Sequence, residues 1–88
     1  MYSIGFAETA IKNLTKIPQS TKKSIFSKIE ELAENPLTVA NVKRLVNFSS
    51  SFRLRVGNYR ILFERNDEIK TLDIVDVLHR KNAYKRRK

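Results

Sequence analysis

The chain has 88 residues, of which 41% are hydrophobic and 31% charged, and this composition predicts one small folded domain spanning residues 1–88. It contains no cysteine and one histidine, which excludes a disulfide framework, a thiolate nucleophile, a cysteine-based zinc site and a cluster of histidines around a metal. No apolar run approaches the roughly 20 residues that span a bilayer, and the first residues lack the pattern of a signal peptide. We therefore expect a cytoplasmic protein that uses no membrane, metal or cofactor.

Positive charge is concentrated in the second half of the sequence. The formal net charge is +9, from 18 lysines and arginines against 9 acidic residues. Residues 1–42 have a net charge of +1 and no arginine, whereas residues 43–88 have a net charge of +8 and every arginine. Because a guanidinium can bind a phosphate through two parallel hydrogen bonds, this asymmetry indicates a polyanionic partner, most readily RNA. An anionic membrane, an acidic protein and a merely solubilising surface are the alternatives.

The first half of the sequence predicts a strand followed by two helices. Alternation over residues 2–6 predicts the strand. Apolar residues at helical spacing then predict one helix that Pro18 ends and a second that Ser20 or Thr21 caps. Asn35 ends the second helix, because a residue that precedes proline avoids the helical region. The apolar stripes are Ala7, Ala10, Ile11 and Leu14 in the first helix and Ile25, Phe26, Ile29, Leu32 and Ala33 in the second.

The second half predicts a sheet. Residues 37–51 show no regular period, and the alternating strand 52–56 follows them. A two-residue turn leads to a strand over residues 59–64, and a third strand over residues 69–78 is apolar on both faces, which predicts a position inside the sheet. A short basic helix or tail ends the chain. The predicted fold is α+β, in the order β-α-α-β-β-β, with a helical hairpin packed on a mainly antiparallel sheet.

Three arginines are predicted to gather on the first hairpin of this sheet. Period 2 places Arg53 and Arg55 on one face of their strand, with Cα atoms about 6.5–7 Å apart, a spacing comparable to that of successive phosphates. The turn at Gly57 and Asn58 brings Arg60 near Arg55. Packed guanidiniums repel one another when no anion lies between them. We therefore expect an anion site, and the alternative is a solvated face with carboxylate partners.

Four further residues are candidates for the same site. Arg80 and Tyr84 are four residues apart and would share a face of a helical turn, where the tyrosine stacks on a base, binds a phosphate or simply closes an edge of the core. His79 can act as an acid or base near neutral pH or have a structural role at the end of a buried strand. Glu64 is expected on the same face as the arginines, as a salt-bridge partner rather than a general base.

Two segments of the chain, Phe52–Phe63 and Val77–Tyr84, resemble the RelE/ParE superfamily of toxin–antitoxin toxins, and the strand and helices before them fit the same pattern. The resemblance implies a RelE-like microbial RNase fold and a toxin of a type II system. Such a toxin enters the ribosomal A site and cuts mRNA there without a metal or cofactor, which inhibits translation. The resemblance also implies contacts with 16S ribosomal RNA, a RelB-like antitoxin that silences the toxin, and a hetero-oligomer of the two.

The resemblance also implies a role for each matching residue. The active-site positions of the family fall on Arg53, Arg55, Arg60, Arg80 and Tyr84. Some members have lysines in place of the first two. Because arginine keeps its proton, His79, Glu64 or the surroundings of the RNA would have to supply the general base. The expected reaction is attack of the RNA 2′-OH on the adjacent phosphorus, with arginines neutralising the charge that builds on the phosphoryl oxygens.

Two other functions stay open on the sequence alone. One is that of the ParE branch, which has the same fold, inhibits DNA gyrase and cuts no RNA. The other is a non-catalytic module that binds RNA or the ribosome. The arginine set and the segment from His79 to Tyr84 favour the RelE branch over ParE. In either toxin we expect an acidic or amphipathic antitoxin segment, most simply a helix, in an apolar groove beside the sheet.

Overall fold

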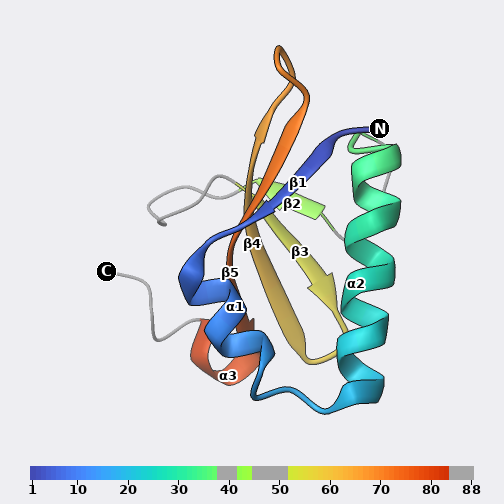
Figure 1. Cartoon of the computed structure of the whole chain (residues 1–88). Helices are drawn as coiled ribbons and strands as arrows, with labels where there is room; N and C mark the ends of the chain where they lie inside the picture. Colours follow the sequence, from blue (N-terminus) through green and yellow to red (C-terminus); the bar gives the residue numbers. More distant parts are fainter. Residues whose placement is uncertain (38–41, 45–51, 84–88) are drawn as a thin grey trace.

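A five-stranded sheet with two helices on one face organises the chain (Figure 1), and the computed structural model describes residues 1–37, 42–44 and 52–83. The strands are β1 (Ser3–Phe6), β2 (Val42–Arg44), β3 (Phe52–Val56), β4 (Tyr59–Asn66) and β5 (Thr71–His79). The helices are α1 (Glu8–Leu14), α2 (Gln19–Glu34) and α3 (Arg80–Ala83). No helix within the described ranges is long and apolar enough to cross a membrane.

The described strands follow the order β1-β5-β4-β3-β2. Neighbours run antiparallel except β1 and β5, which run parallel, so the predicted α+β class with a mainly antiparallel sheet is confirmed. β5 has a neighbour on each side, as its two apolar faces predicted. The ladder between β4 and β5 pairs Leu62 with Asp76 and Phe63 with Ile74, and thus skips Val75. This β-bulge changes which face the later residues of β5 occupy.

The two faces of the sheet differ in character. The helix face, which α1 and α2 cover, holds the main core, formed by Ala10, Leu14, Ile17, Ile25, Ile29, Leu32, Ala33, Leu54, Val56, Ile61, Phe63, Leu72, Ile74 and Val77. The opposite face, called the arginine face from here on, carries Arg53, Arg55 and Arg60, because these residues alternate with core residues along β3 and β4. A small apolar cluster of Leu62, Val75 and Leu78 lies apart from the main core.

The beginnings and ends of the helices differ in part from the prediction. α1 already ends at Leu14, before Pro18. α2 begins at Gln19 with Pro18 at its N-cap, so the predicted capping by Ser20 or Thr21 is wrong, and no side chain of the described residues caps this turn. The Pro18 carbonyl accepts the Lys22 N–H at 2.9 Å, so the helical hydrogen bonds already begin at Pro18, two residues before Ser20 and three before Thr21. The predicted end of α2 at Asn35 is confirmed.

The described chain has one strand more than the predicted order, because β2 forms within the segment that showed no period. β2 is defined by its partner, since Val42 pairs with Leu54 and Lys43 with Arg53. A strand of three residues carries too little pattern of its own to be found from sequence. β5 begins at Thr71 rather than at residue 69, because Lys70 has φ 55° and continues the turn.

Candidate active site

The candidate site is built on the hairpin of β3 and β4. Val56 and Tyr59 are partners in the ladder, so Gly57 and Asn58 alone make the turn, as predicted. Gly57 has φ 57°, a conformation that glycine adopts without strain, and Asn58 has a negative φ. This combination belongs to the type II′ turn, whose twist matches that of the flanking strands. The turn therefore fixes the register of the side chains on both strands.

That register sets positive charges beside one another on the arginine face. Arg55 lies directly opposite Arg60, which confirms their predicted proximity. Lys43 of β2 lies opposite Arg53 and adds a basic residue that the sequence did not single out, because it belongs to the segment without a period. Like charges directly opposite each other destabilise a sheet. An anion bound across these strands would remove that repulsion.

Arg60 is the most buried arginine of the group, with 7% of its surface exposed. Its Nη1 donates hydrogen bonds to the carbonyl oxygens of Gly57 at 3.3 Å and Tyr59 at 3.1 Å. Both acceptors are neutral carbonyls, so these bonds hold the guanidinium in place without cancelling its charge. Arg60 thus remains a fixed cation beside its exposed ladder partner Arg55.

The start of α3 is attached to the same turn. The backbone N–H of Arg80 donates to the Asn58 carbonyl oxygen at 2.7 Å. The carbonyls of the turn and its neighbour therefore hold Arg60 through its side chain and Arg80 through its backbone. The structure brings these two and Arg55 to one end of the sheet, with Arg53 two residues further along β3. Tyr84 lies outside the described residues.

The side chain of His79 belongs to the helix face, away from the arginines. Its ladder partner is Tyr59, and the two rings meet edge to face with centroids 5.3 Å apart. Tyr59 packs against the main core, whereas the next residue along its strand, Arg60, points to the other face. His79 and Tyr59 also line a cleft of about 190 Å³ that includes Asn13 and Lys16.

Of the acidic residues in the sheet, Glu64 lies well along β4 from the hairpin turn, whereas Asp76 pairs with Leu62, two residues from Arg60. Glu64 is on the arginine face, as predicted, because its neighbour Phe63 is in the main core. It pairs with Asp73 and is four residues from Arg60, about 13 Å along the strand. Asp76 is buried, and its Oδ1 accepts a hydrogen bond from the Asn13 side chain at 2.6 Å. Among residues 1–37, 42–44 and 52–83 no three histidine, aspartate or glutamate side chains form a group that could hold a metal ion.

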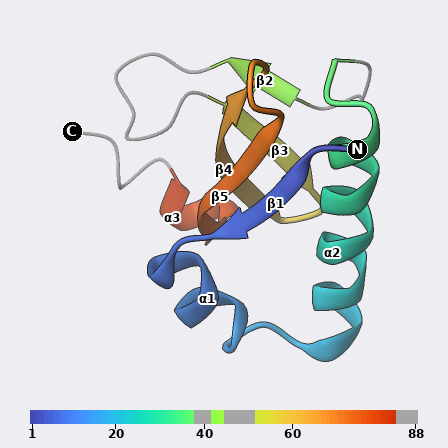
Figure 2. The ribbon, with the colours of Figure 1, turned by 45° about the horizontal axis from the view of Figure 1, so that its top comes forward.

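The helices α1 and α2 diverge from the link between them (Figure 2). An apolar groove lies on this side of the molecule, with lining residues from both helices. Its volume is about 230 Å³. Ile11 is 51% exposed and Phe26 is 38% exposed, although both belong to the predicted apolar stripes. The rings of Phe6 and Phe26 meet at 5.9 Å between centroids. The groove is lined by Phe6, Ile11, Leu14, Thr15, Lys22 and Phe26.

Comparison with known proteins shows the family of this chain. A sequence profile described as "ParE toxin of type II toxin-antitoxin system, parDE" matches residues 4–84. Toxin RelE3 of Methanocaldococcus jannaschii is 37% identical to the chain over 83 residues, which are 90% of this chain and 91% of that toxin. The chain belongs to the RelE/ParE toxin superfamily. The resemblance found in the sequence is thereby confirmed.

Further relatives of this RelE/ParE toxin support the same family. Toxin RelG of Mycobacterium tuberculosis is 31% identical over 86 residues, which are 97% of this chain and 98% of that toxin. The crystal structure of the toxin–antitoxin complex RelBE2 from the same organism matches with a TM-score of 0.76 at 31% identity, covering 90% of this chain and 98% of that one. An archaeal RelE–RelB complex from Pyrococcus horikoshii shares the fold, with a TM-score of 0.77 at 20% identity and a coverage of 90% and 94%.

Proposed function

We propose that this RelE/ParE toxin is a ribosome-dependent endoribonuclease that cuts mRNA in the ribosomal A site and stops translation in the cytoplasm. The observation that carries the proposal is the pair Arg55 and Arg60, two like charges opposite each other at the hairpin turn, with Arg80 attached to the same turn. A phosphate of RNA bound there would remove the repulsion between them. The name of the relative Toxin RelE3 supports the same reading.

The proposed reaction takes its nucleophile from the RNA itself. The 2′-oxygen loses its proton and attacks the adjacent phosphorus, while the bond from phosphorus to the 5′-oxygen breaks and that oxygen gains a proton. The products are a 2′,3′-cyclic phosphate and a 5′-hydroxyl end. Negative charge builds on the phosphoryl oxygens during this step, and guanidiniums that are already in place stabilise it. Because the arginines supply the positive charge, the proposal needs no metal ion.

Each residue of the site has a role in this proposal. Arg60 and Arg55 hold the scissile phosphate, and Arg53 and Arg80 orient it or neutralise its charge. Tyr84 stacks on a base or positions it. Because an arginine keeps its proton, the transfer of protons falls to groups of the assembled ribosome and mRNA. Because the toxin would supply the positive charge and the ribosome the proton-transfer groups, cleavage would depend on the ribosome and its 16S RNA.

Induced expression in bacteria tests the proposal, with primer extension on an abundant message as the readout. We expect growth arrest and new cuts inside translated codons for the unmodified toxin. The Arg60→Ala variant should lose about 100-fold in cleavage, as expected when one preorganised donor to the transition state is removed. Lys28→Ala, which removes an exposed cation from α2 on the helix side, is the matched control and should cut normally. A fully toxic Arg60→Ala variant that still cuts mRNA would contradict the assignment.

A gyrase inhibitor is the second candidate, because the matching profile carries the ParE description. Growth arrest with intact messages, together with inhibition of supercoiling by the purified protein, would replace the ribonuclease by this function. A protein that binds RNA without arresting growth would be a non-catalytic module. The induced cultures, together with the supercoiling and RNA-binding assays on the purified protein, therefore distinguish the three functions.

We also propose that a RelB-like antitoxin neutralises the toxin in a hetero-oligomer. Related toxins have been crystallised as complexes with antitoxins, including the RelB–RelE complex of Methanococcus jannaschii, which is 35% identical to this chain at a TM-score of 0.73 and covers 92% of it. The groove between α1 and α2 suits an amphipathic segment, since apolar side chains line it and a bound segment would bury the exposed Ile11 and Phe26. One of the lining residues is a lysine, Lys22, and Lys12, Lys16 and Lys23 lie on the same stretch of chain, which favours an acidic partner.

A further inference from the structure

Two hydrogen bonds hold the start of α3, one donated by the backbone of Arg80 and one by that of Lys81. The first N–H groups of any helix have no acceptor within the helix. In α3 the Arg80 N–H bonds the Asn58 carbonyl at 2.7 Å, and the Lys81 N–H bonds Nδ1 of His79 at 3.3 Å. His79 directly precedes α3, so its ring nitrogen occupies the position from which the oxygen of a serine, aspartate or asparagine usually caps a helix.

We propose that His79 is a positioning residue, which caps α3 and thereby fixes Arg80 beside the hairpin turn, and that it is not an acid or base of the reaction. The inference deepens the proposed ribonuclease function and rests on it for its activity readout. It assigns to the one histidine of the chain a task that depends on its Nδ1 lone pair.

The hydrogen bond determines the state of the ring. A nitrogen that accepts an N–H bond carries no proton itself, so the capping ring is neutral and holds its proton on Nε2. Transferring a proton through Nδ1 would break the cap. The ring is also held by its edge-to-face contact with Tyr59, at 5.3 Å between centroids. Both contacts keep the imidazole in one orientation.

The position of His79 argues against proton transfer in the same way. A general acid or base must come within hydrogen-bond reach of the reacting oxygen. The ring of His79 lies on the helix face, where it lines the cleft with Asn13 and Lys16. The guanidiniums that would hold the phosphate are on the arginine face of the same sheet. The imidazole thus lies on the other side of the sheet from the face where the phosphate would bind, while the backbone connects His79 directly to Arg80.

A pair of substitutions distinguishes a cap from a proton carrier. The side-chain oxygen of asparagine takes the place of Nδ1 and is a good cap, whereas the amide of glutamine reaches the place of Nε2. We expect the His79→Asn variant to cut mRNA within about twofold of the unmodified toxin, and the His79→Gln variant to lose about fivefold or more, the change that a lost cap brings. A catalytic imidazole would instead make both variants lose about 100-fold or more.

Amide hydrogen exchange of Lys81, measured by NMR on the purified toxin, tests the cap without any activity. We expect about fivefold faster exchange in His79→Gln than in the unmodified toxin and in His79→Asn. Equal exchange in all three proteins would overturn the cap, and an inactive His79→Asn variant with a protected Lys81 would overturn the positioning role. If the unmodified toxin cuts no mRNA, the proposed function fails, and the exchange rates still decide whether His79 caps α3.

Discussion

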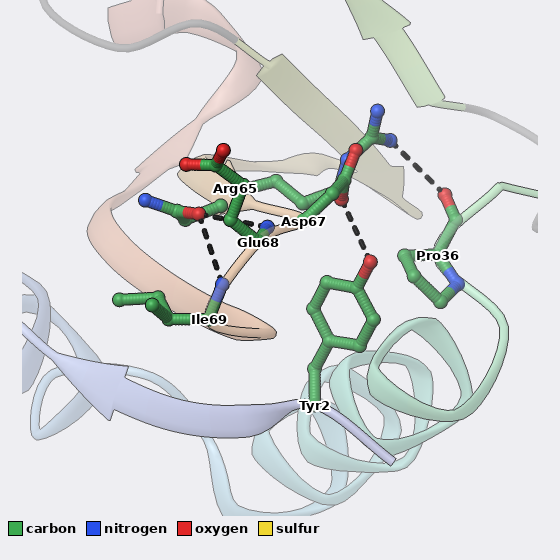
Figure 3. A network of polar contacts seen from close by, with 7 residues as sticks. Tyr2, Pro36, Arg65, Asp67, Glu68 and Ile69 are labelled. Carbon is green, nitrogen blue, oxygen red and sulfur yellow. Dashed lines mark hydrogen bonds and ion pairs between the residues drawn. The ribbon is translucent and has the colours of Figure 1, made fainter.

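At the scale of single residues, Tyr2 forms a hydrogen bond to the turn between β4 and β5. It donates its hydroxyl hydrogen to Oδ1 of Asp67 at 2.7 Å (Figure 3). This hydrogen bond raises the pKa of Tyr2 above its ordinary value, and desolvation and the Asp67 charge act in the same direction. The neutral phenol is the form that bonds, so its contribution to stability is complete below the pKa of the unfolded chain and is lost as the pH rises through the folded pKa. Above about pH 10 we expect stability to fall more steeply with pH in the unmodified toxin than in Tyr2→Phe.

Titration of the phenol absorbance checks the cause of this pKa. Asp67→Ala removes the acceptor, so one tyrosine that titrates late in the unmodified toxin should return to the ordinary range. Tyr2→Phe should remove that same late titration and leave the others in place. A late titration that persists in both variants would show that another tyrosine is responsible, and identical pH dependence of stability in the unmodified toxin and Tyr2→Phe would refute the linkage.

At the scale of elements, Arg65 connects the β4–β5 hairpin to its surroundings. Its Nε pairs with Oδ1 of Asp67 at 3.0 Å, and its Nη1 donates to the Pro36 carbonyl at 3.4 Å just after α2 (Figure 3). The guanidinium carbon also lies 4.6 Å from the centroid of the Phe52 ring in β3. Only 17% of this side chain is exposed. We expect Arg65→Ala to lower the free energy of unfolding by about 1–3 kcal/mol, measured by urea denaturation.

Lys28→Ala is the control for that measurement. Lys28 pairs with Glu31 at 3.3 Å, but the two side chains are 48% and 55% exposed and belong to one helix. An exposed pair of this kind contributes about 0.5 kcal/mol or less. Equal losses for Arg65→Ala and Lys28→Ala would mean that the contacts of Arg65 to other elements add nothing.

The elements that the sequence predicted correctly depend on local patterns. Alternation places Arg53 and Arg55 on one face, and the two-residue turn brings Arg60 opposite Arg55. The features that the sequence did not predict depend on pairing with strands that are distant in the sequence. β2 exists through its pairing with β3, and the skipped Val75, which decides the face of His79, requires the register between β4 and β5. Neither feature has a local signal in the sequence.

At the scale of the whole molecule, the two faces of the sheet have separate tasks in the proposal. The arginine face presents its charges at the hairpin turn, and the apolar groove, with Lys22 in its lining, lies on the helix side of the molecule. The asymmetry of charge along the sequence predicted a basic surface for a polyanionic partner, and the arginine face is formed by the basic second half of the chain. The sequence predicted an apolar groove beside the sheet but not its position. The position depends on how far α1 and α2 diverge, which the apolar stripes of the two helices do not specify. Toxicity and neutralisation should therefore be separable by mutation.

Phe26→Glu separates them. Phe26 is 38% exposed at the groove, so a glutamate there stays hydrated and the fold should be kept. The new carboxylate would face apolar side chains of the antitoxin and lie near its acidic side chains. We therefore expect the variant to bind the antitoxin more weakly by about 2 kcal/mol or more, the loss that removal of a central aromatic residue from an interface causes. Ser27→Glu adds the same charge at the next, exposed position of α2 and is the matched control. In cells that express the cognate antitoxin we expect Phe26→Glu to arrest growth while Ser27→Glu is neutralised. If the antitoxin neutralises both variants equally, it binds elsewhere and the groove has another role.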